Sequence, residues 1–96
     1  MNYYTVLSAT SALLQQQQLT VRRCRRRFNG PHRYILNDAT GSVFHFDELS
    51  KNRRMGYTLF ELLDWMARQP NPKISHEART LLRELDNWQQ LKTANF

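Results

Sequence analysis

Residues 58–91 read TLFELLDWMARQPNPKISHEARTLLRELDNWQQL, and this stretch decides the fold because it predicts two amphipathic helices joined by a turn. Thr58 and Glu61 have the spacing of a capping box, in which two side chains satisfy backbone N–H groups at the start of a helix. Pro70 and Pro72 end that helix, because proline has no N–H donor and restricts the residue before it. The sequence therefore predicts a helical hairpin over residues 58–91.

Both helices carry an apolar stripe at helical spacing, which predicts a buried seam between them. The first helix runs through Gln69, and Ser75 is a good N-cap for the second. The predicted core residues are Leu62, Leu63, Met66, Leu81, Leu82 and Leu85. Trp65 and Trp88 lie on the two helices, so we expect the two indole rings to pack on each other.

Residues 3–28 show the four-and-three spacing of an apolar helix seam. The seam residues are Tyr3, Leu7, Thr10, Leu14, Gln17, Val21, Cys24 and Phe28. Asn29, Gly30 and Pro31 follow as a stop signal. The alternative is a strand over residues 19–28, but strict alternation would then place arginines on both faces. The sequence predicts a long helix over residues 3–28, with Cys24 as a small core residue.

Residues 32–46 predict a β-hairpin. Two short runs of β-branched and aromatic residues, at 34–36 and 43–46, flank a turn-rich stretch that contains Gly41. A lone hairpin is only marginally stable, so it has to pack on the helices. Because 96 residues leave no room for a second core, we expect one domain over residues 1–96. The predicted fold is α+β and mostly helical: a long N-terminal helix, a β-hairpin and a C-terminal helical hairpin.

Positive charge is concentrated in the N-terminal half of the chain. Residues 1–54 carry nine Lys or Arg against three Asp or Glu, whereas residues 55–96 carry five of each. This asymmetry favours an acidic partner, either an anionic protein surface or nucleic acid. The candidate partner-binding residues are Arg22, Arg23, Arg25, Arg26 and Arg27. On a helix, Arg22 would project together with Arg26, and Arg23 with Arg27. A solvated helix end without a partner is the plainer interpretation.

The chain lacks the patterns of an enzyme, a metal site or a membrane protein. His32, His45 and His76 are isolated in the sequence, and no glycine-rich phosphate loop occurs, so we expect no catalytic residue, no metal and no cofactor. No apolar run approaches the ~20 residues that span a bilayer. A single cysteine fits a reducing compartment. We therefore expect a cytoplasmic protein that is not an enzyme.

Pro70, Asn71 and Pro72 form a short segment between the two C-terminal helices. An exposed X-Pro bond isomerises slowly, so such a segment can be a substrate or docking peptide for a prolyl isomerase. A rigid turn between helices is the alternative.

The order of these segments also resembles a known family. A small basic chain with arginines at residues 22–27 before a hairpin, and Pro70, Asn71 and Pro72 between amphipathic helices, is similar to the second anti-RecBCD proteins of lambdoid phages that infect enteric bacteria. The resemblance rests on length, charge and the overall pattern rather than on a diagnostic motif. It implies a modulator that binds the RecC subunit of the host RecBCD nuclease-helicase and alters its response to Chi. It also implies a host cyclophilin-type prolyl isomerase as a companion, in contact with Pro70, Asn71 and Pro72.

Two alternatives to this function stay open. The first is a small basic DNA- or RNA-binding accessory protein whose arginine cluster contacts phosphates. The second is a homo-oligomer joined through the seam of residues 3–28, in which Thr10 and Gln17 would be the polar seam positions.

Overall fold

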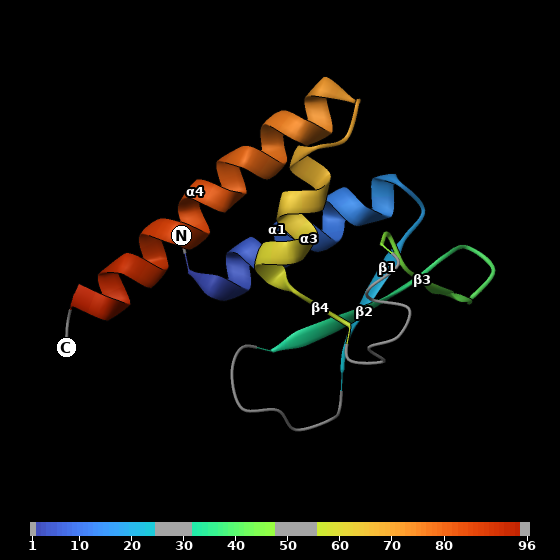
Figure 1. Cartoon of the computed structure of the whole chain (residues 1–96), viewed down its shortest axis with the longest axis horizontal. Coiled ribbons are helices and arrows are strands. Elements are labelled where there is room, and N and C mark those ends of the chain that lie inside the picture. The colour runs from blue at the N-terminus through green and yellow to red at the C-terminus, as the bar shows by residue number, and fades with distance from the viewer. Residues whose placement is uncertain (1, 25–31, 48–55, 95–96) are drawn as a thin grey trace.

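The computed structural model describes residues 2–24, 32–47 and 56–94. In these ranges, three helices lie on one side of a small antiparallel sheet (Figure 1). In chain order the elements are α1 (Tyr3–Gln16), β1 (Thr20–Arg23), β2 (Arg33–Asn37), β3 (Val43–Phe44), β4 (Tyr57–Thr58), α3 (Leu59–Ala67) and α4 (Pro72–Ala94). The predicted class, α+β and mostly helical, is confirmed.

The N-terminal helix is shorter than predicted. α1 ends at Gln16, and Gln18 adopts the left-handed conformation with φ 61°. The Leu19 N–H then donates to the Leu14 carbonyl at 3.0 Å, and the Gln18 N–H donates to the Gln15 carbonyl at 3.0 Å. These two hydrogen bonds define a Schellman motif, in which buried Leu14 and Leu19 are the accompanying apolar pair. Burial of Leu19 therefore ends the helix although the glutamines favour its continuation.

The chain continues as a strand where the long helix was expected. β1 covers Thr20–Arg23, so the prediction of helix over residues 3–28 is wrong beyond Gln16, and residues 25–28 lie outside the described residues. The objection to a strand was that its arginines would occupy both faces. That objection fails because β1 is the end strand of the sheet, with Arg22 and Arg23 both exposed. Cys24, just after β1, is buried as expected, but not on a helix.

The sheet is built around β2. β3 pairs with one end of β2 and confirms the predicted hairpin, while β4 pairs with the other end along the same edge. β1 pairs with the opposite edge of β2, so the sheet has the order β1-β2-β3 with β4 beside β2. In the hairpin turn, the Asp38 carboxylate accepts the backbone N–H of Thr40 at 2.9 Å and of Ser42 at 3.1 Å.

The first helix of the C-terminal helical hairpin begins as predicted, but the second helix begins at a different residue. The capping box of Thr58 and Glu61 is present at the start of α3. α4 begins at Pro72 rather than after Ser75, because the Asn71 side-chain oxygen accepts the Lys73 N–H at 3.0 Å and so caps the helix. Ser75 lies inside α4, where its hydroxyl donates to the Ala67 carbonyl at 2.6 Å. The expected N-cap role of Ser75 is therefore wrong.

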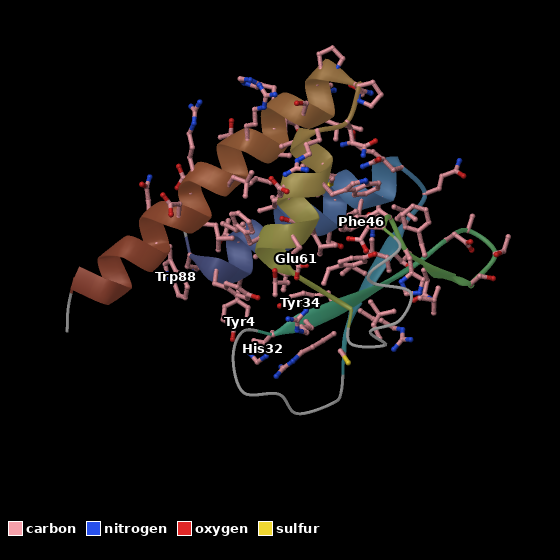
Figure 2. All side chains as sticks on the ribbon, in the orientation of Figure 1. Tyr4, His32, Tyr34, Phe46, Glu61 and Trp88 are labelled. Atoms are coloured by element: carbon pink, nitrogen blue, oxygen red, sulfur yellow. The ribbon has the colours of Figure 1, made fainter. Side chains whose placement is uncertain are left out.

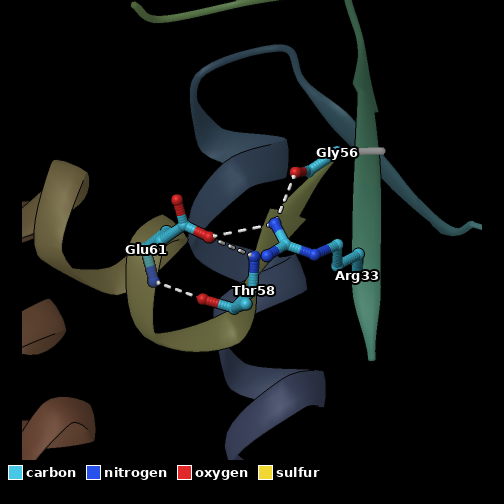
Figure 3. Close-up of polar contacts among 4 residues, drawn as sticks. All are labelled: Arg33, Gly56, Thr58 and Glu61. Atoms are coloured by element: carbon cyan, nitrogen blue, oxygen red, sulfur yellow. Dashed lines mark hydrogen bonds and ion pairs between the residues drawn. The ribbon is translucent and has the colours of Figure 1, made fainter. Parts of the chain in front are cut away.

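Glu61 also connects α3 to the sheet. Its carboxylate accepts the Thr58 N–H at 3.0 Å and forms an ion pair of 3.5 Å with Arg33 of β2 (Figure 3). The Arg33 guanidinium donates to the Gly56 carbonyl at 3.3 Å as well. One arginine thus ties together β2, the start of β4 and the first turn of α3.

The hydrophobic core lies between the helices and one face of the sheet. Of the predicted core residues, Leu62, Leu63, Met66, Leu81 and Leu85 are buried, and Leu82 is half-buried at the edge of the core. The two tryptophans do not pair as expected. Trp65 stacks on Phe46, with ring centroids 4.8 Å apart, whereas Trp88 contacts Tyr3 of α1, with centroids 5.7 Å apart. Trp65 therefore fixes α3 to the segment after β3, and Trp88 fixes α4 to α1.

Candidate binding groove between α1 and β1

The arginine cluster does not form the helical face that its spacing suggested. Arg22 and Arg23 are neighbours on a strand, so their side chains leave opposite faces of the sheet. The Arg22 Nε donates to the Asn37 Oδ1 at 3.2 Å on one face, whereas Arg23 lies on the face toward α1. The predicted helical placement is therefore wrong for Arg22 and Arg23. Arg25, Arg26 and Arg27 lie outside the described residues.

Arg23 lines a groove of about 580 Å³ between α1 and the sheet. One wall is a single face of α1, and the other wall comes from β1 and the start of β2. The lining residues are Tyr3, Tyr4, Leu7, Ser8, Ser11, Ala12, Gln15, Val21, Arg23, His32 and Tyr34. Tyr4, His32 and Tyr34 are gathered in one part of the molecule, below the N-terminal end of α1 (Figure 2).

Two tyrosines join the walls of this groove. The hydroxyls of Tyr3 and Tyr34 are 2.6 Å apart and share a hydrogen bond. Tyr34 is buried and Tyr3 is partly buried against the core. Burial, followed by this hydrogen bond, raises the pKa of Tyr3 above its usual value near 10.0. Tyr3 therefore stays neutral at physiological pH, and its hydrogen bond with Tyr34 holds the N-terminus of α1 against β2.

The groove is basic and rich in hydroxyl groups. Its lining includes the Arg23 guanidinium and the His32 imidazole, and none of the described residues that line it is acidic. The Tyr4 side chain is 78 % exposed at the rim. Tyrosine and arginine side chains are enriched at the energetic centres of protein interfaces. The groove can thus bind an anionic partner, with Arg23 supplying charge, His32 supplying an imidazole for hydrogen bonding and Tyr4 supplying contact area.

The segment of Pro70, Asn71 and Pro72 is on the surface, as expected. All three side chains are exposed, and Asn71 caps α4 while Pro72 is its first residue. No cis peptide bond occurs in the described parts of the chain, so the bonds before Pro70 and Pro72 are trans. This geometry is a well-formed turn that leaves both prolines accessible.

Comparison of the chain with protein-family models, with curated proteins and with solved structures finds no match. Within residues 2–24, 32–47 and 56–94, no group of three or more His, Cys, Asp or Glu is placed to hold a metal ion. No helix in the same ranges is long and apolar enough to cross a membrane.

Sequence reasoning missed most of the groove. Arg23 was predicted as a binding residue, but Tyr3 and Tyr34 are 31 positions apart, and no local pattern indicates that their hydroxyls meet. One signal was available: no residue between positions 2 and 21 is charged, although much of α1 is exposed. An exposed helix face without charge is a feature of contact surfaces, which are depleted in charged residues at their centres.

Proposed function

We propose that this chain is a non-enzymatic modulator that binds the host RecBCD nuclease-helicase through its RecC subunit, in the cytoplasm of the host cell. One observation carries the binding part of this proposal. Exposed Arg22 and Arg23 lie on the end strand of the sheet, next to a groove whose described lining contains no acidic residue. The choice of RecBCD rests on the resemblance in length, charge and segment order described above.

A protein partner suits the chemistry of this surface. Arginine binds carboxylates through two parallel hydrogen bonds, and tyrosine buries a large ring at low cost in conformational entropy. Arg22 and Arg23 leave opposite faces of β1, so they reach two separate acidic groups rather than one row of phosphates. Arg25, Arg26 and Arg27 are the other candidate partner-binding residues, on the ground of sequence alone.

The test is a direct binding measurement with purified components. The chain is titrated against RecBCD, against isolated RecC and against random duplex DNA in the same buffer at physiological ionic strength. We expect saturable binding to RecBCD and to RecC that persists after nuclease treatment, and much weaker binding to DNA. Binding to DNA alone, or binding to RecBCD that disappears with nuclease, would contradict the proposal.

Nucleic-acid binding is the second candidate, and the groove supplies the observation in its favour. Exposed Tyr4 offers a ring for base stacking beside Arg23 and His32, which can contact phosphates. Neutralising several phosphates would make the logarithm of affinity fall linearly with the logarithm of salt concentration. A flat salt dependence with single-stranded and duplex DNA rejects this candidate.

A cyclophilin-type prolyl isomerase is the proposed companion, contacting Pro70, Asn71 and Pro72. Support comes from the exposure of all three residues in a turn that projects between α3 and α4. Pro70→Ala and Pro72→Ala keep the Asn71 cap and remove one isomerisable bond each. Co-purification of the isomerase with wild type, and its loss with one of the variants, is the expected result; equal recovery with both variants shows that the segment is only a turn.

A further inference from the structure

The outer edge of β1 is open for pairing. β1 stands at the end of the strand order, and no strand in the described ranges pairs with its outer side. The Cys24 N–H donates to the Arg33 carbonyl at 2.8 Å, which fixes the hydrogen-bonding pattern of the β1–β2 ladder. Hydrogen-bonded and non-hydrogen-bonded pairs alternate along antiparallel strands. The N–H and C=O groups of Val21 and Arg23 therefore point away from β2.

The same two residues face the groove with their side chains. Val21 and Arg23 line one wall, and the face of α1 from Tyr4 to Gln15 lines the other. Arg22, between them, has its backbone groups directed toward Ile35 of β2. Among the described residues, Val21 and Arg23 thus present main-chain groups that no strand pairs, directly beside a groove walled by a helix.

We propose that an extended, acidic peptide segment of a partner protein adds to the outer edge of β1 as a further strand and lies along the groove against α1. This inference rests on the proposed function, because it specifies how the basic surface engages a protein. Strand addition of this kind obtains affinity from main-chain hydrogen bonds and selectivity from pockets for alternate side chains. Here the peptide pairs with Val21 and Arg23, and every second side chain enters the groove.

The groove determines which side chains fit. Arg23 and His32 attract a carboxylate, while Leu7 and Val21 provide apolar contact for a neighbouring aliphatic side chain. A peptide with an acidic residue and a β-branched residue two positions apart meets both requirements, because residues i and i+2 of a strand lie on the same face. β1 has four residues, so the paired stretch is about 13 Å long and involves four to six residues of the partner, by about 3.3 Å per residue.

The edge also discriminates between a peptide and a nucleic acid. Val21 and Arg23 offer carbonyl acceptors as well as N–H donors, and a peptide backbone satisfies both. A phosphodiester backbone carries acceptors but no donor, so it leaves the two carbonyls unpaired. A peptide is therefore the occupant that the geometry favours.

The test uses the full chain labelled with ¹⁵N and a defined probe, acetyl-TETVTE-amide, in which the glutamates and the valine share one face of the strand. In NMR titration and hydrogen exchange, we expect the probe to shift and protect the amides of Val21 and Arg23, while the amide of Arg22, already bonded to β2, changes little. The matched control probes are acetyl-TKTVTK-amide and a single-stranded thymidylate hexamer. Absence of any shift at Val21 and Arg23 with the acidic probe at millimolar concentration overturns the inference. A stronger response at these amides to either control probe also overturns it.

Variants at Val21 separate the main chain from the side chain. Val21→Pro removes the outward N–H without removing a β1–β2 hydrogen bond, and proline is tolerated on edge strands. We expect Val21→Pro to raise the dissociation constant of the probe about fivefold or more. Val21→Thr keeps the N–H, so its dissociation constant should stay within about twofold of the wild-type value. Equal affinity of Val21→Pro and Val21→Thr contradicts strand addition.

Two further comparisons keep the result interpretable. Arg23→Gln removes the positive charge and retains the backbone, so it should weaken binding of the acidic probe while leaving the pattern of amide protection unchanged. If the spectrum of Val21→Pro shows a disrupted sheet, the Arg23→Gln variant tests strand addition instead. The same variants are measured against RecBCD. Normal RecBCD binding by Val21→Pro refutes strand addition alone, and probe binding without RecBCD binding refutes the proposed function alone.

Discussion

Gly56 illustrates how a single residue positions two elements of this fold. Its φ is +75°, and a Cβ added there would lie 2.2 Å from the Tyr34 carbonyl oxygen of β2. Close approach of the chain before β4 to β2 therefore requires glycine, both for the left-handed conformation and for space. The Gly56 carbonyl in turn accepts from Arg33, so this approach also supports the ion pair with Glu61.

Gly56→Ala should consequently be much more damaging than Gly41→Ala. Gly41 has φ +86° but no atom within 4 Å of an added Cβ, so its substitution costs only the left-handed strain of about 1–2 kcal/mol. At Gly56 the overlap adds about 1–3 kcal/mol more. Urea unfolding of the two variants measures the difference. Equal destabilisation would show that β2 and the chain at Gly56 are not in close contact.

Gln18 is a position at which glycine should give a more stable protein than the natural glutamine. It adopts φ 61° at the end of α1, where glycine carries no penalty. We expect Gln18→Gly to raise the free energy of unfolding by about 0.5–1 kcal/mol, as relief of strain exceeds the added entropy of the unfolded chain. Gln16→Gly, inside α1, is the matched control and should lower it by about 1 kcal/mol. Thermal melts showing a loss of stability in both variants would place position 18 inside a continuing helix.

Tyr3 links stability to alkaline pH. Burial and the hydrogen bond with Tyr34 raise its pKa in the folded protein above the unfolded value near 10.0. The neutral phenol is thus favoured by folding, and this contribution is complete below pH 10 and lost as pH rises above it. Tyr3→Phe keeps the ring and removes the ionisation, so its stability should fall less steeply than that of wild type above pH 10. If the free energies of unfolding of the two proteins fall in parallel above pH 10, Tyr3 is not the group responsible.

At the scale of elements, α4 packs on the core through one face only. Leu85 is 2 % exposed in the seam with the rest of the core, while Leu82 is half-buried at its edge. Leu85→Ala should cost about 2–5 kcal/mol, and Leu82→Ala less than about 2 kcal/mol. Denaturant titrations at low temperature test this order. A larger loss for Leu82→Ala would mean that α4 is rotated relative to the described core.

The elements that could be predicted from sequence are those with redundant local signals. The helical hairpin has a capping box at Thr58 and Glu61, two apolar stripes and a break at Pro70, and the β-hairpin has a turn with Gly41 between apolar runs. β1 lacked such redundancy. Its apolar residues continue the spacing of α1, and only the tertiary burial of Leu19 and the pairing with β2 convert that segment into a strand. Ser75 was predicted as the cap of α4, and Asn71 was missed, although it has the same capping chemistry and accepts the Lys73 N–H in the structure.

At the scale of the whole molecule, the charge asymmetry could be predicted from the sequence, but the groove could not. The arginines at residues 22–27 predicted a basic surface, and Arg22 and Arg23 are indeed exposed. The groove needs the Tyr3–Tyr34 contact between α1 and β2, which depends on the complete fold. The end of α1 at Gln16 also removes the continuous seam of residues 3–28, on which the homo-oligomer depended. Thr10 of that seam is buried inside the molecule.

The proposed docking depends on where the arginines lie and not only on the net positive charge of the chain. Arg22 and Arg23 on β1, and Arg79 and Arg83 on α4, are two exposed arginine pairs on different elements. Reversing either pair changes the net charge equally. The pair on α4 is outside the groove between α1 and β1, so it serves as a matched control.

The most direct test is therefore the dissociation constant for RecBCD of two double variants at physiological ionic strength. The account predicts that Arg22→Glu combined with Arg23→Glu weakens binding about tenfold or more, whereas Arg79→Glu combined with Arg83→Glu stays within about threefold of wild type. Equal affinities of the two double variants, or a greater loss with the α4 pair, would contradict the claim that the basic edge of β1 is the docking surface.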